Sequence, residues 1–370
     1  MSKIFLNILL IVVAIADQGL AQVRTNLPIS GTEPRGPAEL VVCSQNLQNY
    51  GLLPDFLSRN RGTAAREFYR KQDALATRFA TKDCDIIMLQ EVLGREEGAS
   101  EKALENLANV IRQKNNRFYQ VITGPSNDPW TRLGYLLAVD RVEFLNKTSY
   151  FRIELPKLVD EGKPRLFSRG PLEIQVKVKG RAGSNSKTVT LINFHFKSKY
   201  NAQKDPSRTE WETHRMEMAE ALRRIVESRH ATSIQTGETL LVLAGDRNSH
   251  WDAASAEILN GRLRLSNFKT PGTGTPLCKI SGRGVPMCAP GTAGAQSFFS
   301  LLLGDPETKL MPGTHKYKKV YSWLDDMIAP AATLKFARTT FDSEDNFDSG
   351  VVYEPIRASD HAMTWARFNW

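Results

Sequence analysis

The sequence predicts an α/β protein in which strands and helices alternate along one domain. The composition, 41% apolar and 24% charged over 370 residues, is ordinary for a globular protein. Short runs rich in Val, Ile and Leu are typical of buried strands, and longer segments carry apolar residues at helical spacing. No internal repeat is visible. Together these observations favour one large mixed domain.

Seven runs are predicted strands. The clearest is LLVLA at 240–244, which ends at Gly245 and is typical of a strand buried on both faces. In chain order the runs are ELVVCSQN (39–46), DIIMLQ (85–90), GYLLAV (134–139), LEIQVKV (172–178), TVTLINF (188–194), TLLVLA (239–244) and WLDDMIAP (323–330). Helices are predicted at 63–82, 100–114 and 209–228, where apolar residues recur on one face.

The first 21 residues differ from the rest. MSKIFLNILLIVVAIADQGLA has an early lysine, an apolar core and small residues near its end, as in a cleavable secretory signal peptide. An N-terminal membrane anchor is the alternative, although the apolar stretch is short for a membrane span. Residues 22–38 form a polar lead-in, and we expect one domain over 39–370 with a Gly/Pro-rich loop insertion at about 270–296. We therefore expect a secreted or periplasmic protein with no transmembrane segment in the mature chain.

The chain is strongly basic, with a formal net charge of +9. An exported protein with this charge favours polyanions such as nucleic acid, or an anionic membrane surface. Charge alone does not choose between these partners.

Export makes disulfides possible, and the chain has four cysteines. Cys278 and Cys288 lie in the Gly/Pro-rich segment, which has little apolar content to hold it in place. We predict a disulfide between them, contributing about 2.5–3 kcal/mol on the chain-entropy model. Cys43 and Cys84 have the surroundings of buried strand residues.

Polar residues follow the predicted strands at the points where these strands end. Carboxylates, carboxamides and imidazoles are the ligands and proton-transfer groups that metal-assisted hydrolysis requires. A single polar residue at a strand end is usually the solvated start of a loop, but several such endings favour a shared site. The set comprises Asn46, Glu91, His195, Asp246, Asn248, Asp325, Asp360 and His361.

These residues stand in motifs that resemble a known signature. In order the motifs are NLQ (46–48), LQEV (89–92), FSRGP (167–171), NFHFKSK (193–199), GDRNS (245–249), LDDMI (324–328) and SDH (359–361). The series resembles the endonuclease/exonuclease/phosphatase superfamily, whose members are like deoxyribonuclease I. The HFKSK form and the GTHKY segment at 313–317 look closest to secreted bacterial nucleases.

The resemblance implies a four-layered α/β sandwich: two packed, mostly antiparallel sheets with helices outside and the site at one rim. Asn46 and Glu91 would then lie side by side at strand ends. Counting back along straight strands places Cys43 about 10 Å from that rim and Cys84 about 23 Å. A disulfide needs Cα atoms within about 7 Å. This geometry predicts that Cys43 and Cys84 are not bonded.

The resemblance also implies roles for the site residues. Glu91 would be the principal ligand of a Mg²⁺ ion, with Mn²⁺ or Ca²⁺ possible, helped by Asn46 and Asp360. His361 would activate the attacking water and be oriented by Asp325. The remaining roles are orientation of water and phosphate by Asp246 and Asn248, interaction with the leaving oxygen by His195, and phosphate binding by Arg169, Lys197 and Lys199.

The implied function is that of a secreted, Mg²⁺-dependent phosphodiesterase, foremost a DNA endonuclease and a monomer. A phosphatase or sphingomyelinase-type phosphodiesterase is the alternative, and a non-catalytic nucleic-acid-binding protein is a second one. A basic rim would contact phosphates, with aromatic residues for base stacking. The rim candidates are Lys197, Lys199, Lys204, Lys316, Lys318 and Lys319, with Tyr200, Tyr317 and Trp323 for stacking.

Two positions depart from the family pattern. Gln48 stands where several members carry an acidic residue near the metal, which weakens the case for a second tightly bound ion. Arg247 replaces a commoner aromatic residue, and either adds positive charge near the phosphate or alters packing. We interpret Asp326 as a solvated neighbour of Asp325. The other histidines, His214, His230, His250 and His315, are interpreted as surface residues.

Overall fold

The computed structural model describes residues 39–158, 165–179, 186–272, 274–302, 312–337 and 349–369. The expected signal peptide (1–21) and the polar lead-in (22–38) lie outside the described residues. Within the described ranges, no helix has the length and apolar character needed to cross a membrane.

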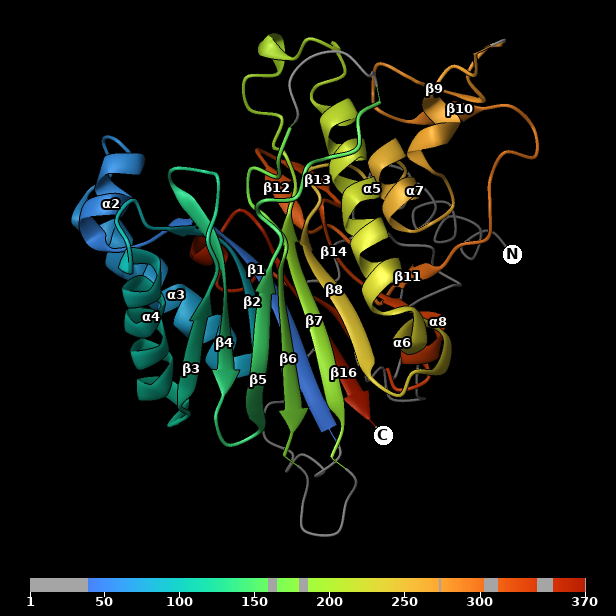
Figure 1. The fold of residues 1–370 in the computed structure, drawn as a ribbon. Coiled ribbons are helices and arrows are strands. Elements are labelled where there is room, and N and C mark those ends of the chain that lie inside the picture. Colours follow the sequence, from blue (N-terminus) through green and yellow to red (C-terminus); the bar gives the residue numbers. More distant parts are fainter. Residues whose placement is uncertain are drawn as a thin grey trace, which may run out of the picture.

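Two six-stranded sheets form the centre of the molecule (Figure 1). In each sheet one neighbouring pair of strands is parallel and the other pairs are antiparallel, as predicted for this fold class. The first sheet has the order β15 (Ser349–Val352), β16 (Met363–Asn369), β1 (Glu39–Tyr50), β2 (Ile86–Leu93), β4 (Thr131–Ala138) and β3 (Tyr119–Thr123). The second has the order β11 (Phe298–Ser300), β14 (Asp325–Pro330), β8 (Leu240–Asp246), β7 (Thr188–His195), β6 (Leu172–Val178) and β5 (Val142–Ser149).

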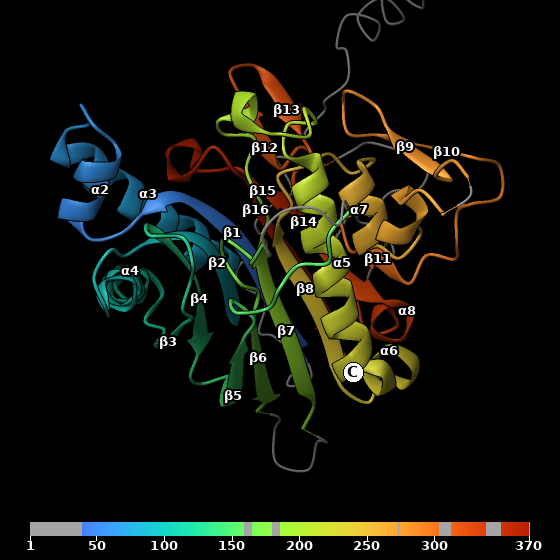
Figure 2. The same ribbon diagram turned by 45° about the horizontal axis from the view of Figure 1, so that its top comes forward.

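Helices cover the outer faces of both sheets, which confirms the four-layered sandwich (Figures 1 and 2). The first sheet is flanked by α2 (Leu53–Arg59), α3 (Ala65–Lys82) and α4 (Ala99–Asn115), and the second by α5 (Glu212–Arg229), α6 (Ala231–Thr236), α7 (Ala254–Leu259) and α8 (Ala331–Leu334). The predicted helices correspond to α3, α4 and α5, although α5 begins at Glu212 instead of at residue 209. Short 3₁₀ turns occur at Ala202–Lys204, Leu265–Phe268 and Ile356–Ala358.

Three hydrophobic cores follow from the alternation of side chains along the strands. In β8, Leu240 and Val242 lie in the core between the sheets, whereas Leu241 and Leu243 pack under α5. Every residue of β8 is buried, so the sequence prediction of a strand buried on both faces is confirmed. A third core lies between the first sheet and the helices α3 and α4.

The two parallel pairs position the site. β1 runs parallel to β2 and is joined to it through α2 and α3, and β7 runs parallel to β8 through α5 and α6. A parallel pair requires such a crossover connection, and its two strands end at the same edge of the sheet. Each sheet therefore delivers two strand ends to one rim.

Two small hairpins stand outside the sheets. β9 (Cys278–Ile280) pairs with β10 (Pro286–Cys288) within the Gly/Pro-rich segment, and the predicted disulfide between Cys278 and Cys288 joins their ends with an S–S distance of 2.00 Å. β12 (His315–Tyr317) pairs with β13 (Val320–Ser322) near the rim (Figure 2).

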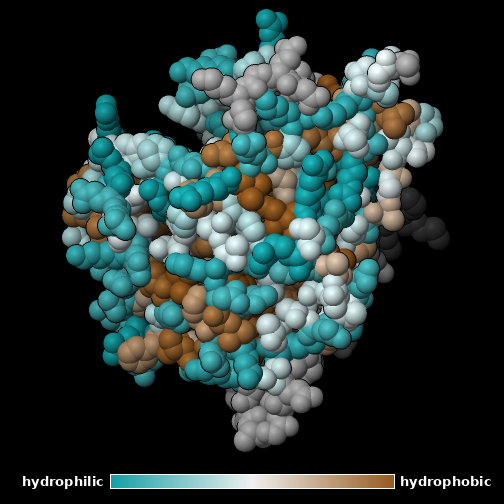
Figure 3. All heavy atoms as spheres, viewed as in Figure 1, coloured by the Kyte–Doolittle hydropathy of each residue, from teal (hydrophilic) through white to brown (hydrophobic). Residues whose placement is uncertain are grey.

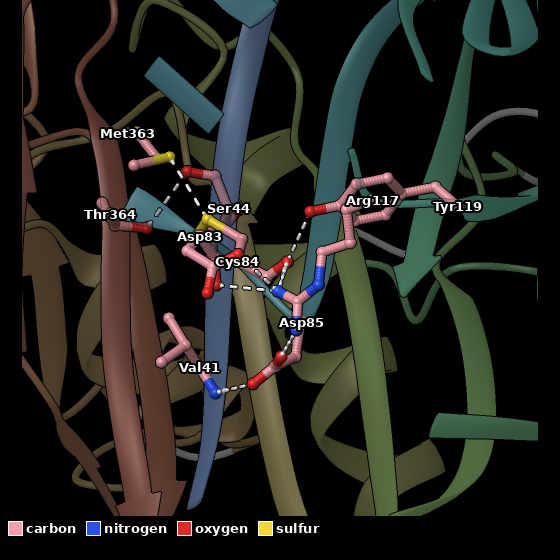
Figure 4. The surroundings of a disulfide bond; sticks show 10 residues. Val41, Ser44, Asp83, Cys84, Asp85, Arg117, Tyr119, Met363 and Thr364 are labelled. Atoms are coloured by element: carbon pink, nitrogen blue, oxygen red, sulfur yellow. Dashed lines mark hydrogen bonds and ion pairs between the residues drawn. A yellow bond between two sulfur atoms is a disulfide. The ribbon is translucent and has the colours of Figure 1, made fainter. Parts of the chain in front are cut away.

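Cys43 and Cys84 also form a disulfide, so the prediction that they are not bonded is wrong. Their S–S distance is 1.95 Å and their Cα atoms are 6.0 Å apart. Figure 4 shows the surroundings of this bond, where Arg117 contacts the carboxylate of Asp85 at 3.0 Å. The backbone N–H of Val41 donates to the same carboxylate at 2.8 Å.

The error came from counting Cys84 as part of a straight strand. The register places Asn46 beside Gln90, and β2 begins only after Cys84. Cys84 lies in the turn that follows α3, where Asp83 has a left-handed backbone with φ 57°. A turn shortens the path along the chain, and it brings Cys84 back to β1.

The two disulfides are expected to differ in their effect on stability. Replacing both Cys43 and Cys84 with alanine should lower the free energy of unfolding by about 4 kcal/mol, against about 2.5–3 kcal/mol for the same change at Cys278 and Cys288. The reason is that the first bond spans 41 residues and the second spans 10. Urea unfolding without reductant measures both. An equal or larger loss for the shorter loop would contradict the chain-entropy explanation.

Candidate active site

One edge of the sandwich collects the predicted site residues. β1, β2, β7 and β8 end at this edge, which is uppermost in Figure 1. β14 is antiparallel to β8 and begins there, so that Asp325 is level with Asp246. His195 is level with Asp246 on the other side. The segment carrying Asp360 and His361 reaches the same edge, where it forms a backbone bridge to β12.

Glu91 lies at a bulge of β2. The register of β2 shifts here, and Glu91 has a left-handed backbone with φ 57°. Its carboxylate accepts hydrogen bonds from the Asn46 side chain at 3.3 Å and from the Asn49 N–H at 3.0 Å. The Glu91 side chain is 22% exposed, whereas Asn46 is fully buried. The bulge thus directs one carboxylate out of the ladder toward solvent.

Asn46 joins two carboxylates. Its Nδ2 donates to Glu91 at 3.3 Å and to Asp246 at 3.0 Å, and its Oδ1 accepts from the N–H of Gln48 at 2.9 Å. The Gln48 N–H can only donate, and it therefore fixes the orientation of the amide. In this geometry Asn46 positions the carboxylates, and its expected role as a metal ligand stays a prediction.

Asp246 is buried and strongly hydrogen-bonded. The backbone N–H of Asn248 donates to it at 2.7 Å and the Asn248 Nδ2 at 2.9 Å. Burial raises the pKa of Asp246, and the neighbouring Asp325 carboxylate raises it further, while His361 acts in the opposite direction. Asn248 has φ 54°, which lets its side chain turn back to Asp246.

Asp325 and His361 form a hydrogen-bonded pair. The His361 Nδ1 lies 2.7 Å from Asp325 Oδ2, and the backbone N–H of Asp325 donates to Thr314 at 2.8 Å. Burial alone would lower the pKa of His361, but Asp325, followed by Asp246 and Asp360, raises it to about 10. With Nδ1 directed to Asp325, the free ring nitrogen is Nε2, which lies 3.9 Å from Asp360.

His195 is buried beside these carboxylates. Its Nε2 lies 3.4 Å from Asp246 and 3.8 Å from Glu91, and within the described ranges neither ring nitrogen has a hydrogen-bond partner. Burial lowers the pKa of His195 well below its ordinary value, and Arg169 and His361 lower it further. His195 is therefore a neutral imidazole with an unused N–H.

The donor set fits a divalent cation. Among the described residues, ligand atoms within 4.8 Å of one another come from Asp246, Asp325 and His361, and from His315, Asp360 and His361. The partly exposed Glu91 adds a carboxylate at the same rim. The carboxylates converge beside the imidazole of His195, whose nitrogens have no hydrogen-bond partner among the described residues, and a bound cation would neutralise the negative charge gathered there. Hard oxygen ligands suit Mg²⁺, Mn²⁺ or Ca²⁺.

The three predicted substrate-binding cations lie in different environments. Arg169 is buried and donates to the Phe196 carbonyl at 2.7 Å. Lys197 is half-buried and stacks over Trp211 at 4.9 Å. Lys199 is exposed and pairs with Glu210 at 3.0 Å. The charges of Arg169 and Lys197 both lower the pKa of His195, which places these two cations beside the site.

His315 is a site residue that the sequence interpretation missed. Its ring centroid lies 4.6 Å from that of His361, and its Nε2 lies 3.9 Å from Asp360. His315 is half-buried, not a surface residue. The GTHKY segment was the available signal, but the pairing of β12 with the distant SDH segment cannot be read from local pattern.

Several other interpretations of single residues are corrected. His214 and His230 are buried, and His230 contacts Glu173 at 3.0 Å. Asp326 is buried and accepts a hydrogen bond from Arg247 at 2.9 Å, so Arg247 alters packing and adds no charge to the surface. The guanidinium group of Arg247 neutralises the charge of the Asp326 carboxylate in the core.

Known proteins match this chain in structure and not in sequence. No family model matches the chain, and no curated protein matches its sequence. Solved structures do match. Humanized TDP2 of D. rerio, with 14 mutations, is 16% identical, with 90% of this chain and 100% of that chain covered and a TM-score of 0.50.

Two further structures match at the same level. An endonuclease/exonuclease/phosphatase family protein from Leptotrichia buccalis is 13% identical, covering 90% of this chain and 100% of that chain with a TM-score of 0.50. ANGEL2, described as a 2′,3′-cyclic phosphatase, is 15% identical, covering 89% and 95% with a TM-score of 0.50. At these low identities, the coverages and TM-scores show a shared fold alone: the chain has the fold of the endonuclease/exonuclease/phosphatase proteins.

Proposed function

We propose that the protein is a secreted, metal-dependent phosphodiesterase that cleaves nucleic acid, with DNA as the foremost substrate. The observation that carries the proposal is the Asp325–His361 pair, 2.7 Å apart, at a rim shared with Glu91, Asp246 and His195. A base with its orienting carboxylate beside oxygen ligands is the arrangement that metal-assisted hydrolysis needs. This arrangement favours catalysis over nucleic-acid binding alone.

Glu91 would be the principal ligand of a Mg²⁺ ion, with Asn46 and Asp360 completing its protein contacts. When bound, the ion neutralises charge on a phosphate oxygen and holds the phosphate in place. The partly exposed carboxylate of Glu91 is accessible for this purpose, whereas the buried Asp246 is held by its hydrogen bonds.

The two site histidines are assigned to the water and to the leaving oxygen. A cation bound at the rim would repel the imidazolium of His361 and lower its pKa from about 10, and the neutral ring would then accept the proton of the attacking water at Nε2, because its Nδ1 donates to Asp325. The resulting imidazolium is stabilised by Asp325. Neutral His195 would donate a hydrogen bond from its free N–H to the leaving oxygen, which takes its proton from solvent, and Asp246 and Asn248 would orient the water and the phosphate between them.

The surface around the rim suits a polyanion. On the face shown in Figure 3, hydrophilic side chains predominate around the upper rim. The β12–β13 hairpin presents Lys318, Lys319 and the 65%-exposed Tyr317 next to His315. Phosphates bind such lysines, and an exposed aromatic ring offers a surface for base stacking. Trp323, in contrast, is 6% exposed, which removes it from the predicted stacking candidates.

A second basic flank lies beside Glu91. Arg95 and Arg59 stack on the Trp130 ring at 4.7 and 5.5 Å. Arg59 Nε also donates to the Asn49 side chain at 3.2 Å, and the N–H of Asn49 binds Glu91. Both guanidinium groups are exposed and preorganised by the indole, as phosphate binding requires.

The lysines of the β12–β13 hairpin should make the affinity for DNA depend on the salt concentration. If four to six cations contact a duplex, the slope of log K against log salt should be about −3.5 to −5.5. Changing Lys316, Lys318 and Lys319 to Gln should flatten this slope by roughly one to three units and leave hydrolysis of a small phosphodiester nearly unchanged. Fluorescence anisotropy with labelled DNA, with Ca²⁺ replacing Mg²⁺, measures it.

A matched triple variant controls for net charge. Lys177, Lys179 and Lys187 lie at the opposite end of the second sheet, since Lys177 pairs with Thr188 and β7 ends at His195. Changing them to Gln removes the same charge and should leave the slope within about half a unit of wild type. Equal flattening by both triples would assign the effect to net charge and remove the hairpin from the DNA track.

The proposed function is tested on a panel of substrates. Purified mature protein is assayed on supercoiled plasmid, single-stranded DNA, RNA, sphingomyelin and a 2′,3′-cyclic nucleotide, each with Mg²⁺ and with EDTA. We expect nicking of the plasmid that EDTA abolishes. Turnover confined to sphingomyelin or to the cyclic nucleotide would replace the nuclease with a sphingomyelinase-type phosphodiesterase or a phosphatase. Binding of DNA without hydrolysis in any assay would favour the non-catalytic alternative.

The proposed layout keeps residues 1–21 as a signal peptide, 22–38 as a lead-in and 39–370 as the catalytic domain, and we propose a monomer. N-terminal sequencing of the exported protein should begin at Gln22. Light scattering should give the mass of one chain.

A further inference from the structure

A buried arginine lies behind the segment that carries His361. Arg78 belongs to α3 and is 1% exposed. Its Nη1 donates to the main-chain carbonyl of His361 at 3.1 Å and to the side-chain oxygen of Gln45 at 2.6 Å. Gln45 lies on β1 and is itself fully buried, and its Nε2 donates to the same His361 carbonyl at 3.2 Å. Two buried donors therefore hold the carbonyl oxygen of His361.

The rest of the guanidinium group holds the chain that leads to His361. Its Nη2 donates to the carbonyl oxygens of Tyr353 and Pro355, the latter at 3.0 Å, and its Nε donates to that of Glu354 at 3.3 Å. These residues follow β15 and precede the 3₁₀ turn at Ile356–Ala358. All five N–H groups of the arginine are thus used. One side chain connects α3, β1 and the segment between β15 and β16.

The acceptors of Arg78 are all uncharged. A buried guanidinium group is costly to desolvate, and amide and peptide oxygens compensate for this less than a carboxylate does. Burial accordingly lowers the pKa of Arg78 to about 9, and the group is still charged at neutral pH. An apolar side chain at this place would avoid the desolvation. Stability alone therefore does not account for an arginine here.

The backbone of His361 is held on both sides. Its N–H donates to Ser359 Oγ at 3.1 Å, and that hydroxyl donates to the Asn46 carbonyl at 2.8 Å. Its carbonyl oxygen accepts from Arg78 and Gln45. With both backbone groups held, only the side-chain torsions of His361 remain to direct the ring toward Asp325, 2.7 Å away.

We propose that Arg78 is a positioning residue of the active site, whose guanidinium group holds the backbone of His361 so that the ring stays against Asp325. This inference rests on the proposed function, in which His361 accepts the proton of the attacking water. The hydrogen bonds of Arg78 go to backbone carbonyls and to Gln45, so its effect on hydrolysis should pass through His361. A lysine here would keep the charge, but its three donors lie on one atom and cannot span the same five oxygens.

The test compares Arg78→Lys with Arg223→Lys in the full chain, on a small phosphodiester at saturating Mg²⁺. Arg78→Lys should lower kcat about tenfold and leave KM within about twofold, because the base acts in the reaction and not in substrate binding. Arg223 is the matched control, a buried arginine of α5 that is bonded to Glu227 and to the Leu259 carbonyl. Arg223→Lys should keep kcat within about twofold. Urea unfolding of both variants shows whether each is folded in the assay.

A second comparison tests whether Arg78 acts through His361. In a His361→Ala background, Arg78→Lys should change the residual rate by less than about twofold, because the group that it positions is absent. General loosening of the site would instead slow both backgrounds equally, and that result would overturn the inference. If Arg78→Lys does not fold, Gln45→Met removes the other donor to the same carbonyl. It should give the same fall in kcat at constant KM, and a wild-type kcat would overturn the inference.

The possible failures are distinguishable. A wild-type kcat in folded Arg78→Lys, or a KM that rises as much as kcat falls, would overturn the inference and leave the phosphodiesterase proposal intact. A wild-type chain that hydrolyses no phosphodiester would overturn both.

Discussion

Replacing His361 with alanine is expected to slow hydrolysis of a phosphodiester by about a thousandfold at saturating Mg²⁺. General-base catalysis contributes roughly 10²–10⁴ to a rate, and His361 is the imidazole whose Nδ1 is fixed by Asp325 at 2.7 Å. Asp325→Ala should cause a loss of about a hundredfold or more, since the ring would lose its orientation. Initial rates on a small phosphodiester, with folding checked by circular dichroism, measure both.

The double variant tests whether Asp325 and His361 act together or independently. If Asp325 acts through His361, His361→Ala with Asp325→Ala should be about as slow as His361→Ala alone. Multiplying losses would show that the two residues serve separate functions. His250→Ala changes an exposed histidine near the rim and should retain nearly the full rate.

Glu91→Gln is expected to raise the Mg²⁺ concentration needed for half-maximal activity and to lower the maximal rate by about a hundredfold. The amide keeps the shape of the side chain and can still accept from the Asn49 N–H, but it lacks the charge that a hard cation requires. Rates over a Mg²⁺ series and direct Mn²⁺ titration should change together.

Glu96→Gln is the matched control for this change. Glu96 is exposed and lies five residues beyond Glu91 in the sequence, so its substitution removes the same charge outside the site. It should leave the Mg²⁺ dependence within about twofold of wild type. Wild-type rates for Glu91→Gln at low Mg²⁺ would remove Glu91 from the set of ligands.

Local sequence pattern predicted the parts of the site that regular strands deliver. Asp246 follows a continuous apolar run that ends at Gly245, and Asp325 begins another apolar run. The pattern therefore places Asp246 at the end of one strand and Asp325 at the start of another. That these two residues would face each other across one ladder was not visible in the pattern. It followed only from the pairing of β14 with β8.

The missed features depend on long-range contacts or irregular backbone. The bulge at Glu91 and the turn at Asp83 break the regular spacing on which counting relied, so the distance to Cys84 was overestimated. His315 has its neighbour His361 far along the chain, so local pattern could not place it at the site.

The position of β16 bears on when such a protein becomes active. β16 lies between β15 and β1, so the first described strand pairs with a strand that is far later in the sequence. Asp360 and His361 immediately precede this strand. A nascent chain holds Glu91, His195 and Asp246 long before it can place His361 against Asp325. Under the proposed function, a chain interrupted before β16 would lack the partner of β1 and the placement of His361, so we expect removal of β16 to abolish hydrolysis.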